Sequence, residues 1–505
     1  MDKLTALDAN FLYSESAQVI NHVASVQEFE LPSGSTSTEF VEGLKTFLMD
    51  RIHTVAYLSR KIIEVPGGLD HPSWIRDTAF HIDNHVYEVA LDFPGSHQQL
   101  EAKVAELHSD LMDRSKPLWK LIVISGLADG TVAYYNQVHH ACIDGMAGQA
   151  ATMILMDNSL DHPEHKVPED FFDAEDTSMR RLFGQAFESL VAYQLGSIRR
   201  TAGAIDSTVS MTQRAIDPSK SFGALLEIAP KTPFGNGISA SRSFSCGKLS
   251  LTNAKAIGKS LDAKVNDVFM AICSGGLRTY LERKAQLPQT SLIAGCPVSL
   301  RAPGAKDMGN AVTLMQVALA TDIRDPRIRL LKIKSSANTA KEVTADLAAG
   351  YEPNVSLPGL PNLLTNLAKL ATSTSDYLPM PFNVVISNVP GPREVLYSNG
   401  AKMLSHYPVS IPTHGLGLNI TVQSYCDSLY FSITACDAAV PNAEELKQDI
   451  LDAFVELKTL LLPKNVTAIR KENVATHHAM PHAATTERPQ AAKFNLNEEP
   501  THKVA

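Results

Sequence analysis

The sequence predicts an α/β protein with two domains, and three observations lead to this prediction. The chain has 505 residues, more than a single hydrophobic core ordinarily serves. Stretches with helical apolar spacing alternate with short β-rich runs over residues 1–156 and again over 215–465. Between these two blocks, residues 157–214 are acidic at first and then helical in pattern, so we expect a connecting segment.

The composition excludes several classes of protein. Hydrophobic residues make up 44% and charged residues 20%, as in an average soluble globular protein. The chain has 45 Lys+Arg and 54 Asp+Glu, and its net charge of -9 is not that of a typical nucleic-acid-binding protein, which carries an excess of basic residues. No signal peptide, no apolar run long enough to span a membrane and no CxxC pair is present. We therefore expect a cytoplasmic protein with reduced thiols, which could also lie peripherally on the inner face of a membrane or on lipid inclusions.

The first domain begins the alternation of helices and strands. A capping box at 96–99 precedes apolar residues with helical spacing over 100–111. Two β-rich runs, 119–125 and 131–138, are separated by turn residues and predict a hairpin. A second helix is expected over 146–157.

The connecting segment contains an apolar helical stripe. Residues Met179 to Ile198 place their apolar side chains on one face, and pairs of arginines flank this face. The favoured interpretation is a helix packed on the second domain. The alternative is an interfacial membrane helix with basic edges.

The second domain repeats the alternation, and the chain then loses its apolar period. The expected helices are Leu251–Leu261, Asp267–Lys284, Pro326–Leu347 and Ala443–Leu462. The expected strands are Leu292–Leu300, Val312–Ala320, Asn383–Asn388, Leu416–Ser424 and Leu429–Ala435. Residues 466–505 are rich in Ala, Thr, His, Pro, Glu and Lys, which predicts a disordered tail.

The segment with the clearest chemical potential is His139-His140-Ala-Cys-Ile-Asp144-Gly145, between a predicted strand and a predicted helix. A histidine can take and return a proton near neutral pH. Asp144 could fix the ring tautomer or brace the loop through a salt bridge, and Gly145 permits a backbone conformation that other residues avoid. A buried polar turn is the structural alternative.

With this motif the chain resembles a known family. HHxxxDG is typical of the chloramphenicol-acetyltransferase-like superfamily. The bacterial wax ester synthase/acyl-CoA:diacylglycerol acyltransferase (WS/DGAT) family is indicated by further segments in the same order: Pro117–Trp119, Asn266–Val268, Pro297–Arg301, Ile386–Pro392 and Leu418–Tyr425. Gln137 stands where the family often has a basic residue, and Ser432 where it often has glycine.

The resemblance implies two chloramphenicol-acetyltransferase-like domains, each a mixed β-sheet flanked by helices, with a substrate tunnel between them. It implies acyl transfer from acyl-CoA to a long-chain fatty alcohol or to diacylglycerol. His140 would be the general base, His139 would support the turn or bind the acceptor, and Asp144 would brace the loop. Arg301 could pair with Asp144. No cofactor and no metal is implied, since acyl-CoA is itself the activated substrate.

A tetrahedral oxyanion needs a hydrogen-bond donor. Asn266 and Asn388 are the candidates, and Gly145 is a third pocket residue. Each asparagine has an ordinary structural interpretation, because Asn is common as a helix N-cap and beside Pro-Gly-Pro turns. Two other functions stay open: a condensation-type enzyme acting on carrier-protein thioesters, and a non-catalytic protein that binds lipid droplets or membranes.

Overall fold

The computed structural model describes residues 1–160, 165–299, 310, 312–348, 363 and 380–462. Its fold is mixed α/β, as the sequence predicts, and contains two large β-sheets and one small one. Residues Met1–Leu462 form one compact unit. The predicted tail over 466–505 and Arg301 lie outside the described residues, and the domain boundaries at 156 and 215 stay a prediction.

The first large sheet has the strand order β12-β13-β2-β7-β6-β5, and β14 pairs with β2 as well. Strand β7 pairs antiparallel with both β2 and β6, which confirms the predicted hairpin, whereas β5 and β6 are parallel. The strands are β2 (His22–Glu30), β5 (Val86–Ala90), β6 (Trp119–Ser125), β7 (Val132–His139), β12 (Tyr397–Ser398), β13 (Ala401–Met403) and β14 (Tyr407–Val409).

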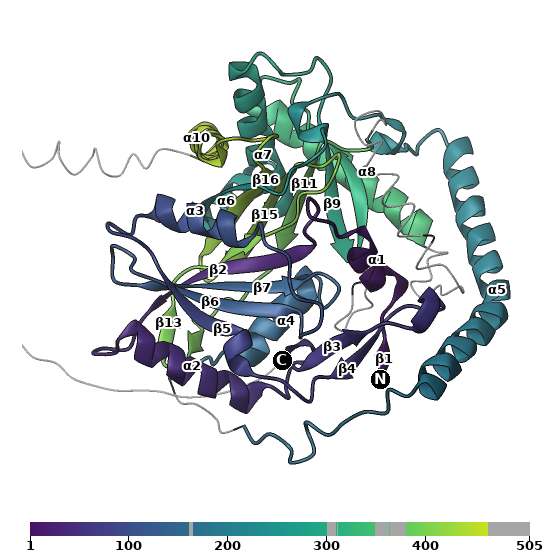
Figure 1. Cartoon of the computed structure of the whole chain (residues 1–505). Helices are drawn as coiled ribbons and strands as arrows, with labels where there is room; N and C mark the ends of the chain where they lie inside the picture. Colours follow the sequence, from purple (N-terminus) through teal and green to yellow (C-terminus); the bar gives the residue numbers. More distant parts are fainter. Residues whose placement is uncertain (161–164, 300–309, 311, 349–362, 364–379, 463–505) are drawn as a thin grey trace, which may run out of the picture. The chain divides into compact units, whose positions relative to one another are not determined.

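Three strands of this sheet come from the distant second half of the chain. Strands β13 and β14 pair with β2, on the side that β7 leaves free. Figure 1 shows β13 in green beside the purple and blue strands of the N-terminal half. The first sheet is therefore completed by residues 397–409, which the sequence pattern does not reveal.

The helices of the first half are α1 (Ala6–Ser14), α2 (Ser37–Arg51), α3 (His97–Leu107) and α4 (Gly145–Leu155). Thr36 and Ser96 begin α2 and α3 with capping boxes, and the box at Ser96 is the one that the sequence predicts. Strands β1 (Asp2–Lys3), β4 (Ser73–Arg76) and β3 (Arg60–Ile63) form the small sheet.

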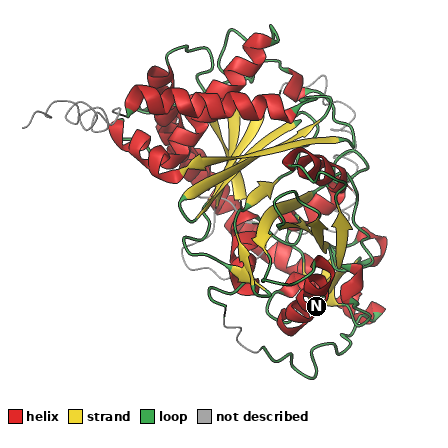
Figure 2. Ribbon diagram, turned by 90° about the vertical axis from the view of Figure 1, so that its left-hand side faces the viewer, coloured by secondary structure: helices red, strands yellow, loops and turns green. Residues whose placement is uncertain are grey.

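The second large sheet has the order β10-β9-β11-β15-β16-β8 and is mixed, since β11 is parallel to β9 and β15. Its strands are β8 (Arg242–Ser250), β9 (Ile293–Ser299), β10 (Val312–Ala318), β11 (Val384–Val389), β15 (Leu418–Tyr425) and β16 (Ser428–Cys436). Helices lie against one face of it (Figure 2): α6 (Leu251–Ser260), α7 (Val265–Arg283), α8 (Pro326–Ala348) and α10 (Ala443–Leu461). The predicted helices and strands of this half are confirmed, with ends that differ by no more than two residues, and β8 is a further strand that the sequence analysis does not predict.

Helix α5 (Met179–Ile216) corresponds to the predicted apolar stripe but continues beyond it. Leu182 is buried and α5 contacts α8, whereas Met179, Phe183, Phe187 and Val191 are exposed, so the packing interpretation is confirmed only in part. Polar contacts also hold the helix: Lys3 Nζ donates to Ser189 Oγ, and Arg214 Nε donates to Asp346. Membrane contact stays a prediction.

Short 3-10 helices complete the described elements: Ala56–Leu58, Pro66–Gly68, Ile82–Asn84, Gly223–Leu226 and Pro233–Gly235. Among the described residues, no helix combines the length and the apolar character that crossing a bilayer requires.

Candidate active site

The motif HHxxxDG forms the turn that joins β7 to α4. Strand β7 ends at His139, and the backbone N–H of Cys142 donates to the carbonyl of His139 over 2.9 Å. Asp144 is the N-cap of α4, because its Oδ1 accepts the N–H of Ala147 over 2.9 Å. Asp144 thus fixes where the turn ends. The proposed pairing of Asp144 with Arg301 lies outside the described residues.

His139 is fully buried and bonded at both ring nitrogens. Its Nδ1 accepts the backbone N–H of Ala141 over 3.0 Å, so the ring proton lies on Nε2, which donates to Glu15 Oε1 over 3.1 Å. Burial lowers the pKa of His139 to about 4, although Glu15 opposes the effect. At neutral pH the ring is uncharged and its orientation is fixed.

His140 follows directly and is partly exposed. The ring of Phe11 stacks on its imidazole with centroids 4.1 Å apart and planes 10° from parallel. Burial lowers the pKa of His140, against the opposing effects of its own backbone carbonyl, Asp144 and Asn310. The ring is therefore neutral at pH 7 and able to accept a proton. Its Nδ1 is buried, with no hydrogen-bond partner among the described residues.

The backbone of His140 is fixed on both sides. Its N–H donates to the carbonyl of Asn21 over 2.8 Å. Its carbonyl accepts Nδ2 of Asn310 over 2.7 Å, and Asp8 in turn accepts from Asn310. Sequence reasoning missed Asp8, Phe11, Asn21 and Asn310, because none of them belongs to a motif or lies near the histidines in sequence.

The two asparagine candidates lie together. Asn388 Nδ2 donates to Asn266 Oδ1 over 3.3 Å, and among the described residues Nδ2 of Asn266 makes a 4.0 Å contact to the sulfur of Met270. The N-cap interpretation of Asn266 is wrong, because α7 begins one residue earlier and Lys264 is the N-cap residue. The Asp267 carboxylate accepts the Lys264 N–H there over 2.9 Å. The Asn266 amide is thus available as a donor at the start of a helix.

Close packing explains why position 145 is a glycine. It is the first residue of α4 and does not have a positive φ, so the predicted need for an unusual backbone conformation is wrong. A Cβ atom at this position would lie 3.1 Å from Cγ2 of Val389. The start of α4 therefore lies against the residue that follows Asn388, which brings the histidine turn and the asparagine pair into one neighbourhood.

Two other groups near the histidines have reactive side chains. Cys142 is buried, and burial raises the pKa of its thiol far above the usual value, so a thiolate nucleophile is disfavoured. Ligand atoms of Glu15, His22 and His139 gather within 4.8 Å of one another, as in a metal site. Here, however, the Nε2 of His139 carries a proton that it donates to Glu15, so the contact is explained by hydrogen bonding.

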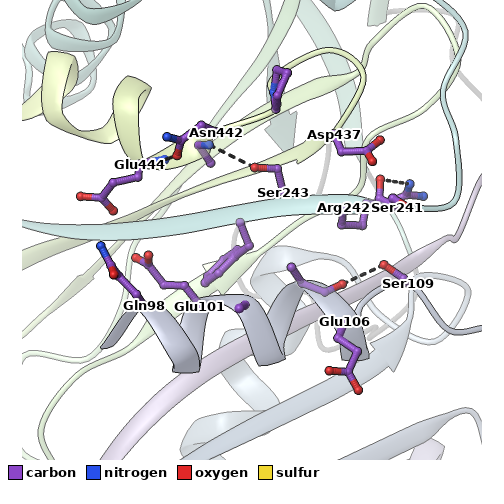
Figure 3. A pocket seen from close by; sticks show the side chains of 15 residues that line it. Gln98, Glu101, Glu106, Ser109, Ser241, Arg242, Ser243, Asp437, Asn442 and Glu444 are labelled. Carbon is purple, nitrogen blue, oxygen red and sulfur yellow. Dashed lines mark hydrogen bonds between the residues drawn. The ribbon is translucent and has the colours of Figure 1, made fainter. Parts of the chain in front are cut away.

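A cavity of about 530 Å³ lies between α3 and the start of β8, away from the histidine turn. Figure 3 shows Gln98 and Glu101 on α3 below β8, with the side chain of Ser243 on the other side of that strand. Its lining is rich in carboxylates and contains no residue of HHxxxDG. We therefore assign the candidate site to the turn, and the predicted substrate tunnel stays a prediction.

Comparisons with known proteins identify the family of the chain. Residues 4–269 match the wax ester synthase/diacylglycerol acyltransferase catalytic domain, and residues 308–458 match the WS/DGAT C-terminal domain. A Mycobacterium tuberculosis protein that carries the name diacylglycerol O-acyltransferase is 35% identical, over 90% of this chain and 99% of its own. The O-acyltransferase WSD of Acinetobacter baylyi is 32% identical, over 88% and 94% of the two chains.

Solved structures give the same answer at the level of the fold. The wax ester synthase/diacylglycerol acyltransferase of Marinobacter aquaeolei VT8 is similar with a TM-score of 0.64 and 29% identity, over 91% of this chain and 99% of that one. The starter condensation domain of rhizomide synthetase shares the fold alone, with a TM-score of 0.54 and 13% identity over 92% and 94% of the chains. The chain belongs to the wax ester synthase/diacylglycerol acyltransferase family and is an O-acyltransferase.

Proposed function

We propose that the chain transfers a fatty acyl group from acyl-CoA to the hydroxyl of a long-chain alcohol or of diacylglycerol, with His140 as the general base. The product is a wax ester or a triacylglycerol. The observation that carries the proposal is the placement of His140 at a strand-end turn, where Phe11 stacks on its imidazole and Asn21 and Asn310 bond its backbone. A fixed neutral imidazole is suited to take a proton from a hydroxyl at pH 7.

The transfer proceeds without a covalent enzyme intermediate. A ring nitrogen of His140 takes the hydroxyl proton as the alcohol oxygen bonds to the thioester carbon. The tetrahedral intermediate collapses, the carbon–sulfur bond breaks, and the imidazolium returns the proton to the CoA thiolate. General acid–base help of this kind contributes about 10²–10⁴-fold. The buried Cys142 supports direct attack, because its raised thiol pKa disfavours an acyl-cysteine.

The developing oxyanion requires a donor. The Nδ2 group of Asn266 is the candidate, because Asn388 already occupies its Oδ1 and so orients the amide. The packing of Gly145 against Val389 supports this placement, since it joins the turn to β11. No metal or prosthetic group enters the proposed sequence of steps.

The test is CoA release from palmitoyl-CoA, with hexadecanol or dipalmitoylglycerol as the acceptor. Wild-type protein should release CoA in an acceptor-dependent manner and form one ester per CoA. His140→Ala should lower kcat by about 10²–10⁴-fold while the melting temperature stays near that of the wild type. Release without acceptor would indicate a thioesterase, and an unchanged kcat in folded His140→Ala would refute the proposed base.

A further inference from the structure

Helix α1 supplies three residues to the histidine turn, although it lies far from HHxxxDG in the sequence. Asp8, Phe11 and Glu15 are three and four positions apart, which places them along one face of the helix and its C-cap. Phe11 contacts His140 directly and Glu15 contacts His139 directly, whereas Asp8 reaches His140 through Asn310. This shared direction indicates that α1 holds the turn in place.

Asp8 and Phe11 act on His140 itself. Oδ1 of Asp8 accepts the backbone N–H of Asn310 over 2.8 Å and its Nδ2 over 2.7 Å, and the same Nδ2 group donates to the His140 carbonyl. Phe11 stacks on the imidazole and accepts Nδ2 of Asn21 at its backbone carbonyl over 2.6 Å. Both the backbone and the ring of His140 are therefore restrained from α1.

Glu15 acts through His139. Its Oε1 accepts Nε2 of His139 over 3.1 Å, and its Oε2 accepts Nε and Nη2 of Arg114 over 3.0 and 2.6 Å. Nε2 of His22 lies 3.1 Å from Oε1 as well. Burial raises the pKa of Glu15, but the hydrogen bond from His139, the nearby ring of His22 and the charge of Arg114 together outweigh burial, so the pKa of Glu15 lies below its ordinary value.

These contacts form a continuous chain from Arg114 through Glu15 and His139 to the backbone N–H of Ala141, the residue next to His140. Gln137 adds to it by donating to Nδ1 of His22 over 3.1 Å, which fixes the ring of His22 beside Glu15. A buried carboxylate with donors on both oxygens is a rigid anchor, because each contact restrains the next.

We propose that Glu15 is a positioning residue of the acyl transfer: it orients His139, which fixes the turn so that His140 faces the reacting hydroxyl. This role rests on the proposed function of His140. Glu15 does not touch substrate. A displacement of about 1 Å from such a change can cost about 10²-fold in rate.

The test is Glu15→Gln, which keeps an acceptor for His139 but removes the charge that Arg114 anchors. We expect kcat to fall by about 10–100-fold, with KM for palmitoyl-CoA within twofold of the wild type. Glu42→Gln is the matched control, since Glu42 is exposed on α2 and pairs only with Lys45 there, and it should leave kcat unchanged.

A double variant separates positioning from simple folding support. Glu15→Gln combined with His140→Ala should be no slower than His140→Ala alone, because residues that act as a unit are not additive. If Glu15→Gln does not fold, Glu15→Asp takes its place. It keeps the charge beside Arg114 but shortens the reach to His139 by one methylene, and it should show the same loss of kcat.

The outcomes separate this proposal from the one on which it rests. An unchanged kcat in folded Glu15→Gln, or losses that multiply in the double variant, would overturn the role of Glu15 while leaving His140 as the base. An unchanged kcat in His140→Ala would overturn both proposals. If kcat of Glu15→Gln falls only as far as its lower melting temperature accounts for, and Glu15→Asp has the full wild-type kcat, then Glu15 supports folding only.

Discussion

Opposing influences set the protonation state of His140. Burial lowers the pKa of its imidazole, and the nearby carboxylates Asp144 and Asp8 raise it only in part. We therefore predict that kcat/KM is level at pH 7 and falls on acidification with an apparent pKa below 6.5, the ordinary value for histidine. A pH–rate profile from pH 4.5 to 8 checks this. An acid limb centred above 6.5 would contradict a lowered pKa of His140 in the working enzyme.

At the scale of the element, α4 depends on its cap. Asp144→Ala removes the acceptor for the Ala147 N–H and should lower the free energy of unfolding by about 0.5–2 kcal/mol, with a corresponding fall in the melting temperature. Asp144→Asn keeps a capping oxygen and should melt near the wild type, because Asn and Asp cap equally well.

The same Asn variant also tests the electrostatic role of Asp144. The charge of Asp144 raises the pKa of His140, so its removal should move the acid limb of the rate profile to still lower pH. An Asp144→Asn enzyme with normal stability, an unshifted profile and no activity would instead mean that the carboxylate contacts substrate.

Elements with a strong local signal could be predicted from the sequence. The hairpin 119–138 and helix α7 were predictable because their apolar periodicity and turn residues are read within a few positions. The contribution of α1 was not, because Glu15 meets His139 only after β2 and β7 have paired. The sequence places Asn266 at the helix boundary because Asn is a common cap, whereas Lys264 is the N-cap of α7 and donates its N–H to Asp267.

The residues of the candidate site also divide into those that the sequence identifies and those that it does not. HHxxxDG identified His140 because the chemistry lies in consecutive residues. Asn310 could not be found, since it holds the His140 carbonyl across 170 positions of sequence. The exposure of Phe183 and Phe187 was also unpredictable, because a helical stripe fixes which side chains share a face but not what covers that face.

For the whole molecule, buried histidines predict acid sensitivity. Burial lowers the pKa of His108 to about 3, of His139 to about 4 and of His406 to about 3. The unfolded chain binds these protons near pH 6.5 and the folded chain does not, so stability should fall as the pH drops from about 6.5 toward 4. Each fully buried histidine contributes up to about 1.4 kcal/mol per pH unit in this range.

Melting temperatures measured between pH 7.5 and 5 check this prediction. Glu15 acts in the same direction at lower pH, because the stabilisation from its lowered carboxylate pKa is lost only as the pH falls below 4.5. His108→Gln should make the decline less steep, since His108 bonds Tyr135 and the Ser410 carbonyl as a neutral ring. A melting temperature that stays constant down to pH 5 would contradict the buried, neutral state of these rings.

Strands β13 and β14 of the first sheet are synthesised long after β2 and β7, and this order has a consequence during translation. Strand β2 pairs with β7 on one side and with residues 401–409 on the other, about 260–270 positions after β7 has left the ribosome. At translation rates of about 5–20 residues per second, β2 waits roughly 15 to 50 s with one open edge. Open strand edges recruit other chains. This protein therefore most needs a chaperone while only its N-terminal half has been synthesised. Slow translation of the second half would prolong the time for which the edge of β2 is open.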